Sequence, residues 1–199
     1  NYLAIGTNNK ICAFDGSLQS LKLGKEFAKK NNIQNVNFVR GDIFDKIFKD
    51  EVFDFIWCNG VLHHTNNCHE GLKKILSQNP NFVLLGLYHK YGRKPFLDYF
   101  KQLQKDGLSE DKLFDEYCKL DKRITDKTHL RSWFNDQVLH PHENQYTLQE
   151  MQELLGTLDM TLEYSSIDED EQKYELIGQQ KLKESSYWPG FFNILARKN

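Results

Sequence analysis

The stretch ICAFDGSLQSLKLGKEFAKKNNIQNVNFVRGD, residues 11–42, decides the fold. It opens with a short apolar run that ends in an acid at Asp15, and this pattern favours a buried strand. Ser17 is then placed to cap a helix that runs to about Asn31. A second apolar run, Asn35–Asp42, follows and again ends in an acid. Residues 11–42 therefore predict a strand, a helix and a second strand of one sheet.

The same alternation continues along the chain. We expect a third strand over Val52–Gly60, a helix near His69–Ser77 and a fourth strand over Asn81–His89. Strands that are apolar throughout and alternate with helices are typical of a parallel sheet covered by helices on both faces.

The second half of the chain has a different pattern. Residues 91–146 are charged, aromatic and helix-prone, with no run that resembles a strand. Thr147 and Glu150 then form a capping box that begins an amphipathic helix. Two more strands are expected, over Met160–Asp168 and Gly190–Lys198, with a polar, acidic connection between them.

These elements predict an α/β fold with three layers. The sheet would be mainly parallel, and its last two strands would add an antiparallel edge. A chain of 199 residues can build one domain with a proper core but is short for two. We therefore expect one domain over residues 1–199, in which residues 91–146 form a helical cap over a substrate pocket.

Composition excludes several classes of protein. The formal net charge is -2 and charges of both signs are mixed, which argues against a nucleic-acid or polyanion binder. No apolar run is long enough to span a bilayer, and no signal-peptide pattern opens the chain. The four cysteines show no CxxC spacing, so we interpret them as reduced thiols of a cytoplasmic protein.

Polar and small residues follow three of the expected strands. They are Asp15-Gly16-Ser17, Gly41-Asp42 and Asn59-Gly60. Ligands of an open parallel sheet bind at the carboxyl ends of its strands. One acid there can accept both hydroxyls of a ribose, and an acid one strand later can accept the amine of adenine. The alternative is that these residues only form turns and cap helices.

The residues resemble a known family. The segment that extends the opening stretch to Asp45, followed by FDFIWCNGVLHHT (53–65), LLGLYHKYGR (84–93) and GFFNILARK (190–198), is similar to class I S-adenosylmethionine-dependent methyltransferases. More narrowly, it resembles their small-molecule branch with an LHH motif. The resemblance covers nearly the whole chain and implies a Rossmann-like sheet. It also implies a first strand and a glycine-rich loop before Asn1, so that this chain is a fragment of a longer product.

The resemblance implies which residues bind S-adenosylmethionine. Asp15 would hold the ribose hydroxyls, Asp42 the adenine amine, and the segment from Asn59 the methionine part, mostly through its backbone. The implied cofactor-binding set is Asp15, Gly16, Ser17, Gly41, Asp42, Ile43, Asn59, Gly60 and Val61.

Three residues are candidates for the chemistry. His64 could act as general base on a substrate hydroxyl, because an imidazole titrates near neutrality. Its alternative, shared with His63, is a packing or backbone-orienting role. Tyr88 and Arg93 follow the fourth strand, where an acceptor would dock. Arg93 could hold a carboxylate or phosphate, or it could form a surface salt bridge.

Further histidines leave other interpretations open. The histidines and Cys68 within residues 63–69 cluster in sequence, but their spacing matches no standard zinc pattern, so no metal is expected. The pair His140 and His142 lies in the inserted segment and suits a polar loop or a substrate-facing role.

The predicted function is methyl transfer from S-adenosylmethionine to an O, N or C nucleophile of a small molecule. One alternative is a nicotinamide-dependent oxidoreductase, which also needs an acid after its second strand but normally has a second mononucleotide half. The other is a non-catalytic binding domain, since the glycine-rich loop is not in this chain.

Overall fold

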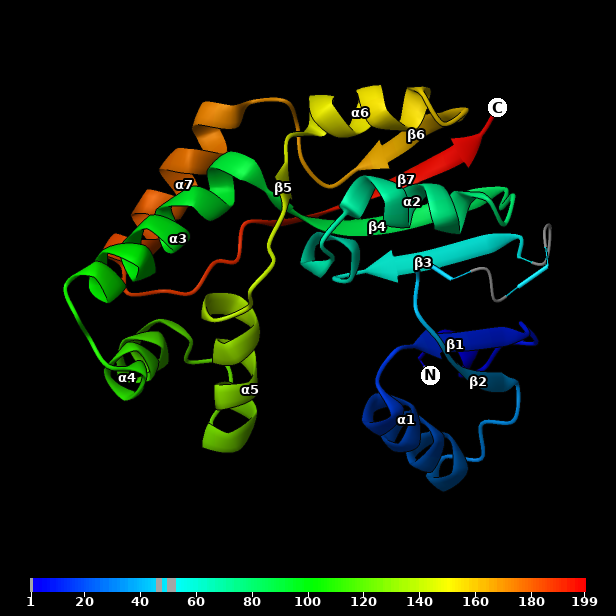
Figure 1. Cartoon of the computed structure of the whole chain (residues 1–199), viewed down its shortest axis with the longest axis horizontal. Coiled ribbons are helices and arrows are strands. Elements are labelled where there is room, and N and C mark those ends of the chain that lie inside the picture. The colour runs from blue at the N-terminus through cyan, green and yellow to red at the C-terminus, as the bar shows by residue number, and fades with distance from the viewer. Residues whose placement is uncertain (1, 46–47, 50–52) are drawn as a thin grey trace. The chain divides into compact units, whose positions relative to one another are not determined.

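The computed structural model describes residues 2–45, 48–49 and 53–199 (Figure 1). The chain forms two compact units, Asn1–Val52 and Phe53–Asn199. Each unit has its own sheet. The predicted start of the third strand at Val52 lies outside the described residues.

The first unit is a strand–helix–strand motif, as residues 11–42 predict. β1 (Ile11–Asp15) and β2 (Val36–Arg40) pair in parallel, with Ile11 opposite Val36 and Asp15 opposite Arg40. α1 (Leu18–Lys30) connects them and buries Leu21 and Ala28. A 3-10 helix, Tyr2–Ala4, precedes β1.

The second unit is built on a five-stranded sheet in which β4 (Phe82–His89) pairs with three other strands. β3 (Phe55–Asn59) and the short β5 (Gln145–Tyr146) pair with β4 in parallel. β7 (Phe191–Lys198) runs antiparallel to β4 and to β6 (Met160–Ser165). The predicted antiparallel pair at the C-terminus is therefore confirmed, with β7 inside the sheet and β6 next to it.

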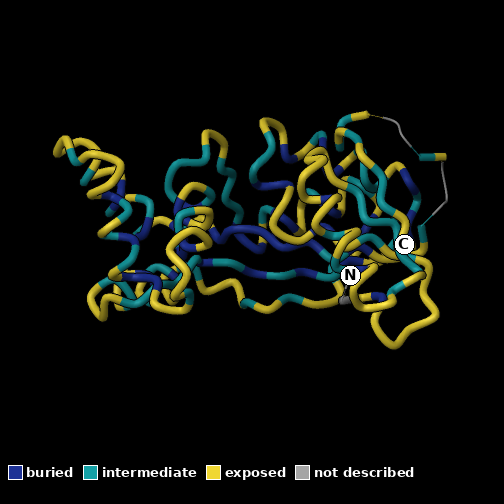
Figure 2. Tube along the Cα trace, turned by 90° about the horizontal axis from the view of Figure 1, so that it is seen from below, coloured by how far each residue is buried: buried dark blue, intermediate teal, exposed yellow. Residues whose placement is uncertain are grey.

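The core of this sheet follows the alternation of side chains along its strands. Val83, Leu85 and Leu87 of β4 are fully buried, and so are alternate residues of β7. Figure 2 colours buried residues along the chain dark blue. On the other face, Phe55, Trp57 and Phe82 stay more than one third exposed. Successive strand residues point to opposite faces, so one face carries most of the buried apolar area.

Helices occupy much of the rest of the second unit. The part predicted as a helical cap forms three helices with a shared aromatic core that includes Phe100, Tyr117 and Phe134. The helices of the unit are α2 (Cys68–Leu76), α3 (Lys90–Lys105), α4 (Glu110–Leu120), α5 (Lys127–Val138), α6 (Leu148–Gly156) and α7 (Glu171–Lys183).

α7 corrects the sequence analysis, which treats residues 169–189 as an irregular connection. Only two of its residues, Tyr174 and Gly178, are buried, so its apolar stripe is too weak to predict a helix. α7 lies beside α3 (Figure 1), and a Cβ on Gly178 would lie 2.9 Å from the carbonyl oxygen of Gly92. The backbones of α7 and α3 therefore pack closely at Gly178.

Candidate functional site

The end of β1 holds the first predicted site residues. Oδ1 of Asp15 accepts the backbone N–H of Ser17 at 2.7 Å, and Oγ of Ser17 accepts the N–H of Ser20 at 3.2 Å. The first bond fixes the turn and the second caps α1. The Asp15 residue remains exposed, so its carboxylate is open to hydroxyl donors.

The end of β2 lies beside this turn. The N–H of Gly41 donates to the carbonyl oxygen of Asp15 at 3.2 Å. A Cβ on Gly16 would lie 3.5 Å from the carbonyl oxygen of Gly41. Asp42 is exposed, its Oδ1 accepts a backbone N–H of its own turn, and the half-buried Ile43 follows. Unit 1 thus brings its six predicted residues to one end of its sheet.

The end of β3 in the second unit is a tight turn. Gly60 has a φ of +76°, which favours glycine, and its N–H donates to the carbonyl oxygen of Gly86 at 3.1 Å. Asn59 lies against Gly86, because a Cβ there would be 1.7 Å from Oδ1 of Asn59. Val61 follows with 47% of its surface exposed. The sequence analysis assigns these residues and those of unit 1 to one ligand, and this assignment stays a prediction.

His63 is a packing residue. It is 1% exposed, and its ring centroid lies 4.2 Å from that of Tyr88. Burial, followed by the nearby charge of His64, lowers the pKa of His63 to about 3. The imidazole is therefore neutral near neutral pH, and its Nδ1 is a buried atom without a hydrogen-bond partner among the described residues.

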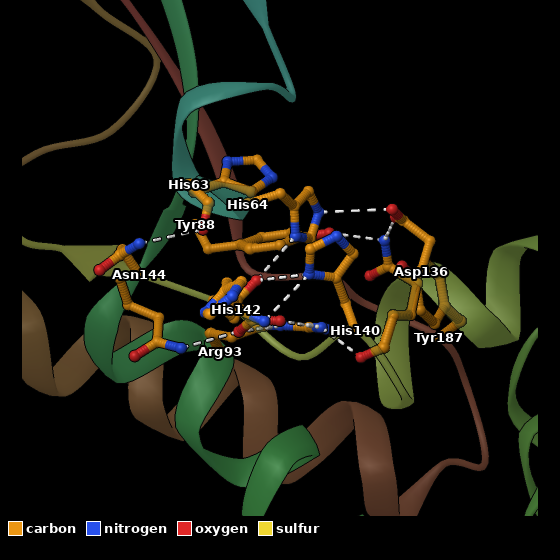
Figure 3. A network of polar contacts seen from close by, with 12 residues as sticks. His63, His64, Tyr88, Arg93, Asp136, His140, His142, Asn144 and Tyr187 are labelled. Atoms are coloured by element: carbon orange, nitrogen blue, oxygen red, sulfur yellow. Dashed lines mark hydrogen bonds and ion pairs between the residues drawn. The ribbon is translucent and has the colours of Figure 1, made fainter. Parts of the chain in front are cut away.

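His64 is paired with a carboxylate that the sequence analysis missed. Its Nε2 lies 3.4 Å from Oδ1 of Asp136 in α5, and its Nδ1 lies 3.2 Å from the carbonyl oxygen of His142 (Figure 3). Burial lowers the pKa of His64, but the hydrogen bond and charge of Asp136 outweigh it, so the pKa is raised. The pair stabilises the imidazolium form, which is what a proton-accepting histidine requires.

The side chain of Gln137 connects Tyr88 to this pair. Nε2 of Gln137 donates to the hydroxyl of Tyr88 at 2.5 Å and to Oδ2 of Asp136 at 2.8 Å, while its Oε1 accepts the hydroxyl of Tyr187 at 2.7 Å. Burial is the main reason that the pKa of Tyr88 rises to about 12. Tyr88 is therefore a neutral phenol near pH 7 that can position a ligand but not act as a base.

Arg93 has partners within the protein. It is fully buried, and its Nε and Nη2 donate to the two carboxylate oxygens of Glu143 at 3.0 and 2.8 Å. Nη2 also donates to the carbonyl oxygen of Gln137 at 2.6 Å, and the guanidinium lies 4.3 Å from the ring centroid of Tyr88. These contacts correspond to the salt-bridge alternative, although the pair is buried and not at the surface.

The segment around residues 140–146 is hydrogen-bonded to the turn that contains His63 and His64. The backbone N–H of Asn144 donates to the carbonyl oxygen of His63 at 2.8 Å, and its Nδ2 donates to that of Thr65 at 2.9 Å. The ring of His140 lies 4.2 Å from that of His64. Figure 3 shows His64, His140 and Asp136 gathered beside Tyr88. The inserted segment therefore supplies half of a site whose other half follows β3 and β4.

Residues 2–123 match the profile of a protein family described as a methyltransferase domain. The chain belongs to this family. The sequence-based prediction of a methyltransferase is thereby confirmed at the level of the family. Nothing in this match supports the nicotinamide-dependent alternative.

Solved structures of other methyltransferases share the fold. PKMT2 from Rickettsia typhi, in complex with AdoHcy, is 12% identical with a TM-score of 0.62; the alignment covers 94% of this chain and 43% of that protein. A putative methyltransferase from Bacillus halodurans is 16% identical with a TM-score of 0.55, over 99% and 96% of the two chains. A putative sarcosine dimethylglycine methyltransferase from Galdieria sulphuraria is 11% identical with a TM-score of 0.59, over 100% and 73%.

This methyltransferase domain thus spans less than half the length of PKMT2. No curated protein matches its sequence. At these identities the solved structures support the fold, and they confirm the predicted α/β class with its mixed parallel and antiparallel sheet.

Two further properties concern only the part of the methyltransferase domain that the structure describes. Within residues 2–45, 48–49 and 53–199, no group of three or more histidine, cysteine, aspartate or glutamate side chains is placed to hold a metal ion. Within the same residues, every helix is too short or too polar to cross a membrane.

Proposed function

We propose that this chain transfers the methyl group of S-adenosylmethionine to a small-molecule acceptor, with His64 accepting the proton that the acceptor loses. The family match supports methyl transfer. The observation that carries the rest is the contact between His64 and Asp136, because it gives the domain a proton acceptor with a stabilised charged form.

Each unit has a strand end that suits one part of the cofactor. The open Asp15 carboxylate suits the ribose hydroxyls, and Asp42, exposed at the next strand end, suits the adenine amine. At Gly60 no described atom beyond the glycine and its two chain neighbours lies within 4 Å of the position that a Cβ would take, so the backbone there is open to the methionine part. S-adenosylmethionine, when bound, supplies an electrophilic methyl group.

In this proposal, residues of the second unit orient the acceptor and remove its proton. The acceptor's proton reaches Nε2 of neutral His64 by way of the Asp136 carboxylate, which lies against Nε2 and stabilises the imidazolium that results. The phenol of Tyr88, held by Gln137, is placed to orient the acceptor by a hydrogen bond. Arg93 acts indirectly, since its bonds to Glu143 hold the segment that contains His140 and His142. An acceptor with a weakly acidic hydroxyl would benefit most from such a base.

Cofactor binding is tested by titrating the protein with S-adenosylhomocysteine in a calorimeter. Asp15→Ala should weaken binding by about tenfold or more, because a carboxylate that accepts two hydroxyls contributes about 1.5–3 kcal/mol. Glu26→Ala on the exposed face of α1 is the matched control and should leave the affinity unchanged. Equal affinity of the Asp15→Ala protein and the control would contradict the proposed site.

A further inference from the structure

A hollow lies at the end of β4. It is separate from the histidine network, by which we mean the contacts among His63, His64, Tyr88, Asp136 and Gln137. Tyr88 and His89 are consecutive residues of this strand, so their side chains point to opposite faces of the sheet. Tyr88 joins the network around Gln137, whereas His89 lines a cavity of about 320 Å³. Residues 147–149 and 169–172 form the rest of its lining.

Three helices begin at this cavity, and each is already capped by a side chain. Nδ1 of His89 accepts the N–H of Gly92 in α3 at 3.0 Å. Thr147 caps α6 in a capping box, and Asp170 caps α7 with an N–H···O distance of 3.0 Å. The helix N-termini thus have protein acceptors, so they do not call for a bound anion.

The charge of the lining is negative. Glu169, Asp170 and Glu171 follow one another, and none of them forms an ion pair with a basic residue in the described part of the chain. Glu171 accepts a hydrogen bond from the hydroxyl of Tyr91, which leaves its charge without a cationic partner among the described residues. The two nearby lysines are already neutralised, since Lys90 pairs with Glu150 and Lys173 with Asp168, both at 2.5 Å. The cavity therefore offers carboxylates to a positively charged ligand.

His89 adds a buried donor to these acceptors. It is only 2% exposed, yet it lines the cavity. Because its Nδ1 accepts a backbone N–H, the neutral ring carries its proton on Nε2. Among the described residues, the hydrogen bond of the ring is the one at Nδ1. Burial lowers the pKa of His89, which keeps the ring in this neutral, donating form.

The size and lining of the cavity favour an organic cation over a metal ion. No three acidic or histidine side chains in the described residues converge tightly enough to hold a metal ion. A volume of about 320 Å³ also exceeds what one ion fills and lies at the lower end of small-molecule sites. The carboxylates and the His89 donor that line the cavity suit a ligand with two polar groups.

We propose that this cavity binds a small organic ammonium ion that also carries a hydroxyl or carbonyl oxygen. The ammonium group lies against Glu169 and Glu171, and the oxygen accepts the Nε2–H of His89. The site is separate from the histidine network and does not depend on methyl transfer.

The experiment follows backbone amide signals by NMR while 4-aminobutan-1-ol is added to the protein. Shifts at residues 147–149 and 169–172 are expected, and the neutral butane-1,4-diol should produce none. The double variant Glu169→Gln, Glu171→Gln should bind about tenfold more weakly. Glu184→Gln, at the far end of α7, is the matched control and should bind as the parent protein does.

A second variant isolates the histidine. Asn is a good helix cap, so His89→Asn keeps the start of α3 while it removes the Nε2 donor. It should weaken binding of the amino alcohol about tenfold and leave binding of butylamine, which lacks the oxygen, unchanged. The proposal is overturned if the diol shifts the same amides, if magnesium or calcium does so at lower concentration, or if no amide of the lining responds.

Discussion

Oδ1 of Asp136 lies 3.4 Å from Nε2 of His64, and it joins α5 to the turn that follows β3. The carboxylate raises the pKa of the imidazole, against the effect of burial. Burial raises the pKa of Asp136, but the bond to His64 outweighs it and the pKa is lowered. Each side chain thus stabilises the charged form of the other.

Asp136→Asn should therefore lower the pKa of His64. The amide keeps the size of the side chain but removes the charge that stabilises the imidazolium. The pKa can be measured by following the ring C–H signals of His64 during an NMR titration, so no acceptor is required. Asp111→Asn, which changes an exposed carboxylate paired with Arg131, is the control and should leave His64 unchanged. An unaltered His64 titration in Asp136→Asn would refute the coupling.

The same pair predicts how stability depends on pH. A raised pKa in the folded state stabilises the fold below the ordinary histidine pKa of 6.5, and this contribution is lost as pH rises through the folded value. A lowered aspartate pKa stabilises the fold above the ordinary 3.8, and this contribution is lost as pH falls through the folded value. The contribution of the pair is therefore fully present between pH 3.8 and 6.5.

Urea unfolding at several pH values measures this effect. The difference in unfolding free energy between the parent protein and His64→Gln should be largest near pH 5–6 and should shrink toward pH 8. The Asp136 side chain is 42% exposed, so solvent screening keeps the effect small. A difference that stays constant over this range would contradict the assignment.

Sequence reasoning succeeded where the signal is local. Ser17 caps α1, and Thr147 with Glu150 forms the capping box of α6, because these contacts join residues three positions apart. It failed for α7, where the stabilising contact is between Gly178 and α3. It also missed Asp136, since only tertiary packing brings α5 to His64, and no spacing rule connects the two.

Arg93 illustrates the same limit. Its position after β4 predicted a residue near an acceptor, but the sequence could not distinguish a ligand from Glu143 as its partner. Both outcomes need the same guanidinium geometry. Only the fold shows that Glu143, fifty positions further along the chain, occupies it.

Arg93→Ala should destabilise the second unit severely. It leaves the Glu143 carboxylate, whose side chain is 11% exposed, with a hydrogen bond from Gln145 but without its charged partner, and breaking a buried ion pair costs about 3–5 kcal/mol. Lys94→Ala is the matched control in the next position, because Lys94 forms solvent-exposed pairs with Asp98 and Glu175, and it should destabilise the unit far less. The free energies of unfolding in urea compare the two. Similar values would show that the buried pair does not hold the segment around His142.

Gly190 lies against the backbone of α3, and its replacement tests the fold around the site. It has a φ of +63°, and an added Cβ would lie 2.6 Å from the backbone nitrogen of Arg93. Gly107 has a similar φ of +79°, but no described atom beyond its own residue and its chain neighbours lies within 4 Å of its Cβ position. Gly107→Ala therefore measures the strain of the left-handed conformation alone, about 1–2 kcal/mol.

Gly190→Ala should lower the free energy of unfolding by more than Gly107→Ala does. The backbone of α3 must move to make room for the Cβ, because it cannot rotate away as a side chain can. The movement would also displace the hydrogen bond from the N–H of His89 to the carbonyl oxygen of Gly190, and with it the first turn of α3, which contains Arg93. Urea unfolding of the two alanine variants gives the difference, and the NMR titration of His64 shows whether the displacement reaches the histidine network. If the free energy of unfolding falls equally in both variants, the contact between Gly190 and the start of α3 is looser than the structure has it.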